Sequence, residues 1–237
     1  KPKDISEKDV KELFSKPLEE IYNKYSKPEL LGKAVAPLLV EDEKGDPDLL
    51  KELLAKAKTA ETAALLSAVI SWADVQMSGN TYYNLARNPI GAMLMSFAKS
   101  GVVSNVENSI SAFNKAYETA RKVIKEGSLI NDAALYLLEN LNTNVQVFSI
   151  GFSETFKYYA DLPGALKRGE DTPTVSDSDH EESLAKAVNE LKNELENANK
   201  KLIAKYGEEN FKQVTTWFGT FVDSIVTYYT QGRLPEN

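Results

Sequence analysis

Few residues of this chain could take part in metal or nucleophilic chemistry. Its 237 residues include one histidine and no cysteine, so disulfides, thiolate metal sites and cysteine nucleophiles are excluded. The histidine, His180, stands among carboxylates in segment 177–182 (DSDHEE), which could together ligate a metal ion. The favoured interpretation is a solvated helix start, because acidic side chains are stabilised at the positive end of the helix dipole. We therefore expect no metal site.

Sequence motifs of catalysis are also missing. The chain has no Gly-x-Ser-x-Gly elbow, no glycine-rich phosphate loop and no pair of histidines at metal-ligand spacing. Chemistry based on carboxylates alone stays open in principle, and Asp74, within an apolar segment, is the best candidate for a buried acid. The more ordinary account places Asp74 at a helix edge, hydrogen-bonded to a neighbouring turn. We expect no enzyme, no catalytic residue and no cofactor.

Aromatic residues are the most suggestive feature of the sequence. Six of the eleven tyrosines form three adjacent pairs, each toward the end of an apolar segment that is followed by proline. With the two tryptophans, they could line a cavity for a flat or lipidic ligand or form a contact surface for a protein. Ordinary core packing is the third account. The candidate ligand- or partner-binding residues are Trp72, Tyr82, Tyr83, Tyr158, Tyr159, Trp217, Tyr228 and Tyr229.

Charge and hydropathy narrow the classes of partner. The net charge is −7, and the sequence shows no basic patch that would overcome the repulsion between an acidic surface and nucleic-acid phosphates. We therefore expect no nucleic-acid binding. The most apolar stretch, residues 60–77, contains Glu61 and Asp74 and is interpreted as a buried helix, so no membrane span is expected. The partner class that remains is another protein or a second copy of the chain.

Apolar residues recur at helical spacing from end to end, which predicts an all-α bundle of about eight to ten helices. Segment 60–78 is expected to end at Gly79-Asn80, and Ser104 to cap a helix over 105–126 that Gly127 closes. Further helices are expected over 129–142 and 145–159. The second of these alternates like a strand, but the sequence offers no second strand to pair with it.

The last two predicted helices differ in pattern. Over 181–206 the apolar residues form a narrow seam with 4-3-4-3-4 spacing and charged flanks, typical of a surface helix packed along one edge. Gly207 separates it from 208–230, whose wide apolar stripe predicts a core helix. The seam consists of Leu184, Val188, Leu191, Leu195, Ala198 and Leu202.

The chain is expected to form one domain, residues 1–237. Segment 162–180, rich in Pro, Gly, Ser and Asp, is expected to be a flexible loop. A more polar helix precedes an apolar helix with a tyrosine pair three times, which allows three helical hairpins in series. The three units share no residue-level motif, so unrelated helices of one bundle are the competing interpretation.

These observations favour a non-enzymatic structural or protein-interaction protein, such as an assembly subunit or an adaptor. The alternative is a helical binding module that holds an apolar or aromatic small molecule between its helices. A carboxylate-only enzyme is the third hypothesis. The first predicts a protein partner or self-assembly, and the second predicts a pocket bordered by Trp72 and the tyrosine pairs.

Overall fold

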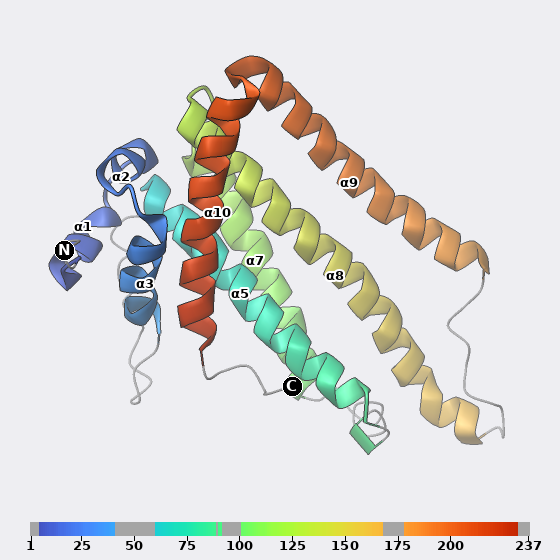
Figure 1. The fold of residues 1–237 in the computed structure, drawn as a ribbon. Coiled ribbons are helices and arrows are strands. Elements are labelled where there is room, and N and C mark those ends of the chain that lie inside the picture. Colours follow the sequence, from blue (N-terminus) through green and yellow to red (C-terminus); the bar gives the residue numbers. More distant parts are fainter. Residues whose placement is uncertain (1–4, 41–59, 89, 92–100, 168–177, 232–237) are drawn as a thin grey trace.

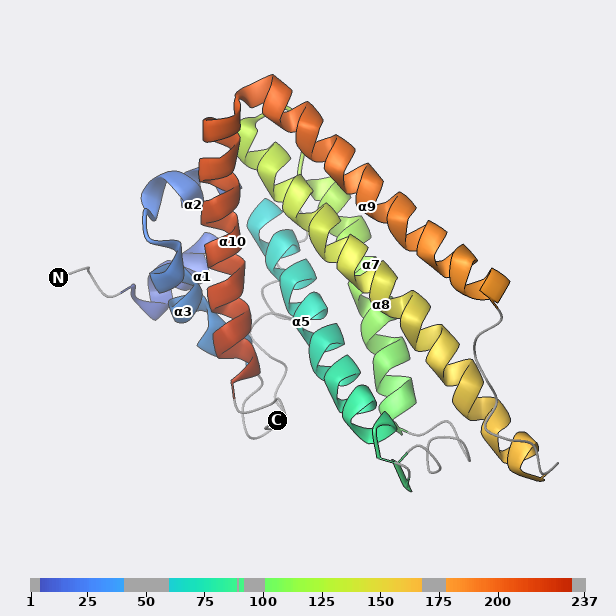
Figure 2. The ribbon, with the colours of Figure 1, turned by 45° about the vertical axis from the view of Figure 1, so that its right-hand side comes forward.

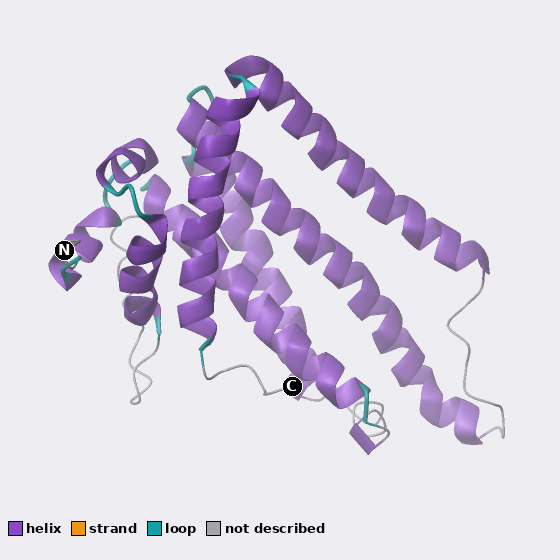
Figure 3. Ribbon diagram, in the orientation of Figure 1, coloured by secondary structure: helices purple, strands orange, loops and turns teal. Residues whose placement is uncertain are grey.

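The computed structural model describes residues 5–88, except 41–59, together with 90–91, 101–167 and 178–231 (Figure 1). Within these residues all regular secondary structure is helical (Figure 3), which confirms the predicted all-α bundle. None of the described helices is long and apolar enough to cross a membrane. The helices are α1 Glu7–Leu13, α2 Leu18–Lys24, α3 Pro28–Leu39, α5 Glu61–Ala86, α7 Gly101–Val123, α8 Leu129–Lys167, α9 Ser178–Tyr206 and α10 Glu208–Thr230.

The long helices α5, α7, α8 and α9 run side by side, and α9 lies at the outer edge beyond α8 (Figures 1 and 2). Helix α10 and the short helices α1 to α3 gather at the opposite side of the molecule. The most extensive packing joins α5 to α7 and α10 to α3. Three hairpins in series would pack neighbouring helices of the chain against each other. The packing of α3 on α10, which lie at opposite ends of the chain, does not fit that arrangement.

Helix α5 is the central helix of the bundle, as its nearly uniform apolar sequence predicts. Its buried residues extend from Thr62 to Tyr82 and point in several directions around the helix. The main core joins them to buried side chains of α1, α2, α3, α7, α8 and α10. A smaller core consists of Tyr82, Val103, Val106 and Phe152 and closes the far end of α5, α7 and α8.

Two glycines allow close approach between helices. A Cβ at Gly32 of α3 would lie 1.8 Å from Ser224 Oγ and 2.9 Å from the Phe221 carbonyl oxygen of α10. A Cβ at Gly79 of α5 would lie 2.7 Å from the Phe148 ring of α8. Helix α5 continues past Gly79 to Ala86, so the prediction that Gly79-Asn80 ends a helix is wrong. Glycine is tolerated inside α5 because the space beside it is filled by Phe148.

Helix boundaries in the second half also differ from the prediction. Helix α7 begins at Gly101, so Ser104 lies inside the helix rather than at its cap. It ends at Val123, so the prediction that Gly127 closes it is also wrong. Helix α8 is continuous through 143–144 and 160–167, which joins two predicted helices and takes in the start of the expected 162–180 loop. A proline inside a helix removes one backbone hydrogen bond and its ring clashes with the carbonyl four residues earlier, which can kink the helix without ending it, and α8 continues past Pro163. Helix α9 begins at Ser178, and the rest of that expected loop, 168–177, lies outside the described residues.

Candidate interaction surface

Helix α9 carries the least buried apolar stripe of the molecule's long helices. We call Leu184, Val188, Leu191, Leu195, Ala198 and Leu202 the α9 seam. Every residue of the seam is half-buried, and no α9 side chain that the structure describes is buried. A seam with this spacing normally inserts its side chains between those of a facing helix. In this structure that packing is incomplete, because each seam residue keeps part of its surface exposed.

The C-terminal end of α9 is fixed to the start of α8 by Asp132. This buried carboxylate accepts hydrogen bonds from the Tyr206 hydroxyl, from the Gly127 backbone N–H at 3.0 Å and from Lys205 Nζ at 3.3 Å. Residues Leu202, Ile203 and Tyr206 pack against the main core beside it. We call this hydrogen-bonded group the Asp132 clasp. It holds the last two turns of α9 against the bundle.

Ionisation in the clasp follows from burial and from these hydrogen bonds. Burial opposes the charged form of Asp132, but the three donors outweigh it and hold the pKa of that carboxyl below its ordinary value of 3.8. Burial raises the pKa of the Tyr206 hydroxyl, and its bond to Asp132 raises it further. The hydrogen bonds to Tyr206 and to Asp132 raise the pKa of Lys205. At neutral pH a charged acceptor therefore faces a neutral hydroxyl and a charged ammonium group, which suits a structural contact.

Beyond the clasp, α9 is attached more loosely. Helix α9 contacts α8 along part of its length, but this packing is much less extensive than that of α5 with α7. Within the described part of the chain, the α9 side chains packed against the main core are those of the last two turns. Figure 2 shows α9 at the edge of the molecule, with no further helix on its outer side. The N-terminal turns of the seam thus have one covered side and one open side.

The facing side of α8 adds two apolar residues to this surface. Ile150 follows Asp132 by 18 residues, about five helical turns, so the two share one face of α8. Val147 lies one turn earlier on the same face, and both Val147 and Ile150 are half-buried. The buried residues Val145 and Phe152 lie on the core side of α8. Because Asp132 contacts α9, the face that it shares with Val147 and Ile150 is the one turned toward α9.

The two tryptophans among the predicted site residues join helices. Trp72 Nε1 donates to Asn144 Oδ1 at 3.0 Å, which links α5 to α8. Trp217 is buried, and its Nε1 donates to the Tyr25 carbonyl oxygen at 2.8 Å. Its ring meets the Tyr22 ring edge-on with centroids 5.3 Å apart. Both indoles therefore act in packing between α-helices.

The tyrosine pairs lie in separate places. Tyr82 is buried in the smaller core and meets Tyr83 edge-on, with centroids 5.2 Å apart. Tyr229 is buried and donates to Asp74 Oδ1 at 2.9 Å, so Asp74 bonds a residue of α10. Tyr228 is exposed, with Lys33 Nζ 5.7 Å from its ring centroid. Tyr158 and Tyr159 belong to α8, but their side chains lie outside the described residues. The described pairs do not border one pocket.

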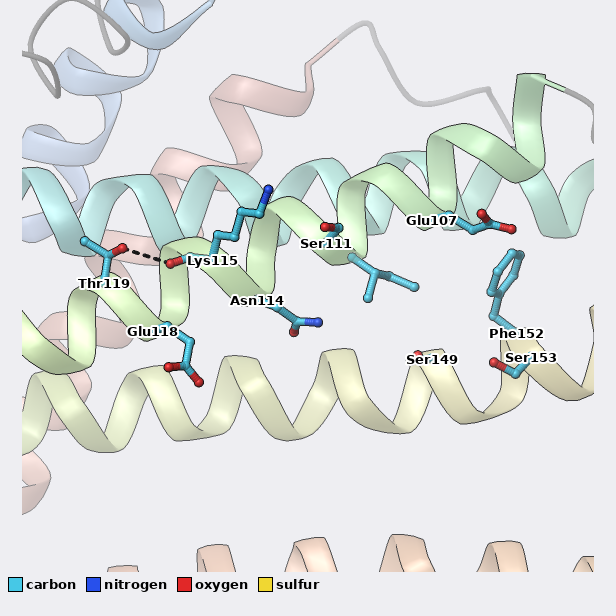
Figure 4. A pocket seen from close by; sticks show the side chains of 10 residues that line it. Glu107, Ser111, Asn114, Lys115, Glu118, Thr119, Ser149, Phe152 and Ser153 are labelled. Carbon is cyan, nitrogen blue, oxygen red and sulfur yellow. Dashed lines mark hydrogen bonds between the residues drawn. The ribbon is translucent and has the colours of Figure 1, made fainter.

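An open groove of about 760 Å³ lies between α7 and α8 (Figure 4). Polar side chains and the apolar residues Ile110 and Phe152 line it together. Gln146 Nε2 of α8 donates to Asn114 Oδ1 of α7 at 3.2 Å, which links the two walls. The eight predicted aromatic residues are not among its described lining. The residues that line it are Glu107, Ile110, Ser111, Asn114, Lys115, Glu118, Thr119, Ser149, Phe152 and Ser153.

A second hollow of about 450 Å³ lies beside Trp217, between α10 and the segment that joins α2 to α3. Among the residues that the structure describes, no three side chains of His, Asp or Glu are grouped so that they could hold a metal ion. The side chain of His180 lies outside this description, although its backbone belongs to α9.

Comparisons with known protein families, curated proteins and solved structures give no match. Sequence reasoning found the α9 seam but missed the Asp132 clasp, because Asp132 and its partners Lys205 and Tyr206 lie more than 70 residues apart. An acidic residue near a helix start is ordinary, so no local signal marked it.

Proposed function

We propose that this chain is a non-enzymatic interaction protein, an assembly subunit or adaptor, that binds an amphipathic helix of a protein partner along the α9 seam. The observation that carries the proposal is the half-burial of the whole seam on a 29-residue helix fixed firmly at one end. A partner helix would cover the open side of the seam and leave the charged flanks in water.

The energetic support comes from the four seam leucines, Leu184, Leu191, Leu195 and Leu202. Burying one leucine side chain completely stabilises by about 1.5–3 kcal/mol, and each of these is already half-buried. Completing their burial supplies at most about 1 kcal/mol per leucine toward association, from which the entropy cost of binding is subtracted. The surface therefore suits a partner of moderate affinity.

The alternative, a module for an apolar or aromatic small molecule, has weaker support. Trp217 does line a hollow, but its indole N–H already bonds the Tyr25 carbonyl and its ring packs on Tyr22. A ligand in this hollow would contact Trp217, whose hydrogen bond and ring contact already serve the packing of α2 against α10. The α9 seam offers a continuous apolar stripe along one helix.

The proposal is tested with a fluorescent designed peptide, a helix of about four heptads with leucine at every seam position. The 237-residue chain is titrated from nanomolar to high micromolar concentration, and the anisotropy of the peptide is measured. We expect saturable binding that Leu191→Lys weakens by at least about tenfold, or ~1.4 kcal/mol, while far-UV circular dichroism stays unchanged.

Asn193→Lys is the matched control. Asn193 is exposed on the same helix, so this substitution adds the same charge outside the seam. It should bind the peptide as the unsubstituted chain does. Absence of binding by the unsubstituted chain would overturn the proposal. So would unfolding of Leu191→Lys, since the seam would then be part of the fold itself.

A further inference from the structure

The charges of α9 are divided between its two ends. Residues 179–196 carry six acidic and two basic side chains, a net charge of −4, whereas 197–206 carry three lysines and no acid, a net charge of +3. Two such helices side by side attract each other when they run in opposite directions and repel when they run in the same direction. The helix thus complements a reversed copy of itself.

The seam has the same property. Its 4-3-4-3-4 spacing reads identically in both directions, so a reversed copy keeps all six seam residues in register. With a two-fold axis at Asn193, Leu191 lies opposite the partner's Leu195, and Val188 opposite the partner's Ala198. A two-fold axis makes every such contact occur twice, which is the usual construction of a homodimer.

From these two observations we infer that the occupant of the α9 seam is a second copy of this chain, bound antiparallel through α9. The inference rests on the proposed function and names the partner of that surface. Each copy contributes α8 and α9, so the joined pairs form a four-helix arrangement around the two seams. Val147 and Ile150, half-buried on the α9 side of α8, lie at the border of this arrangement.

The absence of native cysteine makes disulfide trapping a direct test of orientation. We prepare two full-length variants, Val188→Cys and Ala198→Cys, and oxidise them separately and mixed. A disulfide requires Cα atoms within about 7 Å, so antiparallel pairing links the two variants only in the mixture. Linkage of either variant with itself, or of none, overturns the inference.

Sedimentation velocity tests the charge argument. We expect the unsubstituted chain to dimerise and Lys201→Glu to weaken the dimer by about tenfold, because each charge acts twice in a symmetric pair. Lys186→Glu makes the same charge change within the acidic half of α9 and should not weaken dimerisation. Equal weakening by both variants would show an effect of net charge alone and would contradict the antiparallel arrangement.

The two proposals fail separately. A chain that stays monomeric at high concentration but binds the designed peptide through the seam keeps the proposed function and overturns the homodimer. A chain that does neither overturns both. A dimer that persists unchanged in the Leu191→Lys variant would place the self-association elsewhere and also overturn the inference.

Discussion

Helices α9 and α10 are consecutive, similar in length and regular in their apolar spacing, yet they differ in how deeply their side chains are buried. Helix α10 buries nine residues between α3, α5 and α8, whereas no described side chain of α9 is buried. Gly207, at φ 87°, forms the turn between them. Because the chain changes direction there, α10 enters the bundle while α9 lies along its edge. The difference lies in the width of the apolar stripe: that of α10 is wide and aromatic, and that of α9 is a single narrow seam. A wide stripe can be buried by several helices of its own chain at once, while a narrow seam packs along one edge of the bundle.

The strongest way to break this comparison is to remove a buried ring of α10. Phe218 is 1% exposed and packs in the main core. Phe218→Ala should lower the free energy of unfolding by about 3–5 kcal/mol, because it leaves a cavity that neighbouring helices fill only partly. Urea denaturation followed by circular dichroism measures the change. A loss below about 1 kcal/mol would mean that α10 is no better anchored than α9.

The Asp132 clasp, where α9 meets the bundle, should have an intermediate effect. Asp132→Asn keeps the shape but removes the charge that accepts three hydrogen bonds, so we expect a loss of about 1–3 kcal/mol at neutral pH. Amide hydrogen exchange should speed up along α9 and stay unchanged in α10, since the clasp holds only α9. Equal acceleration in both helices would contradict the assignment.

The same clasp should make stability depend on pH in one direction. Because the pKa of Asp132 is lowered in the folded chain, its contribution is present above the ordinary value of 3.8 and is lost as the pH falls through the folded pKa. The difference in unfolding free energy between the unsubstituted chain and Asp132→Asn should therefore shrink below about pH 4. A difference that stays constant down to pH 2 would exclude the carboxylate charge as its source.

Local patterns in the sequence predicted where the helices lie along the chain better than which helices pack against each other. The narrow seam, the wide α10 stripe and the end of α9 at Gly207 follow from neighbouring residues, and the structure has them. The continuity of α5 past Gly79 depends on Phe148, some 70 residues away, and the packing of α3 on α10 depends on the space beside Gly32. The tyrosine pairing is visible in the sequence, but the positions of Trp72, Trp217 and Tyr229 depend on contacts with distant residues. Such distant contacts leave no local signal.

The smallest expected loss of stability is that of truncating a leucine of the α9 seam, and it separates α9 from α10 most clearly. Leu195 is half-buried in the α9 seam, so Leu195→Ala should cost the isolated chain only about 1 kcal/mol, well below the cost of truncating a buried core residue. If the seam is completed by a second copy, the melting temperature of the unsubstituted chain rises with protein concentration, and the Leu195→Ala variant loses that rise. Asn197→Ala, at an exposed position of the same helix, should keep it. A loss of about 3 kcal/mol that does not vary with concentration would instead show that α9 owes its stability to the chain's own core, as α10 does.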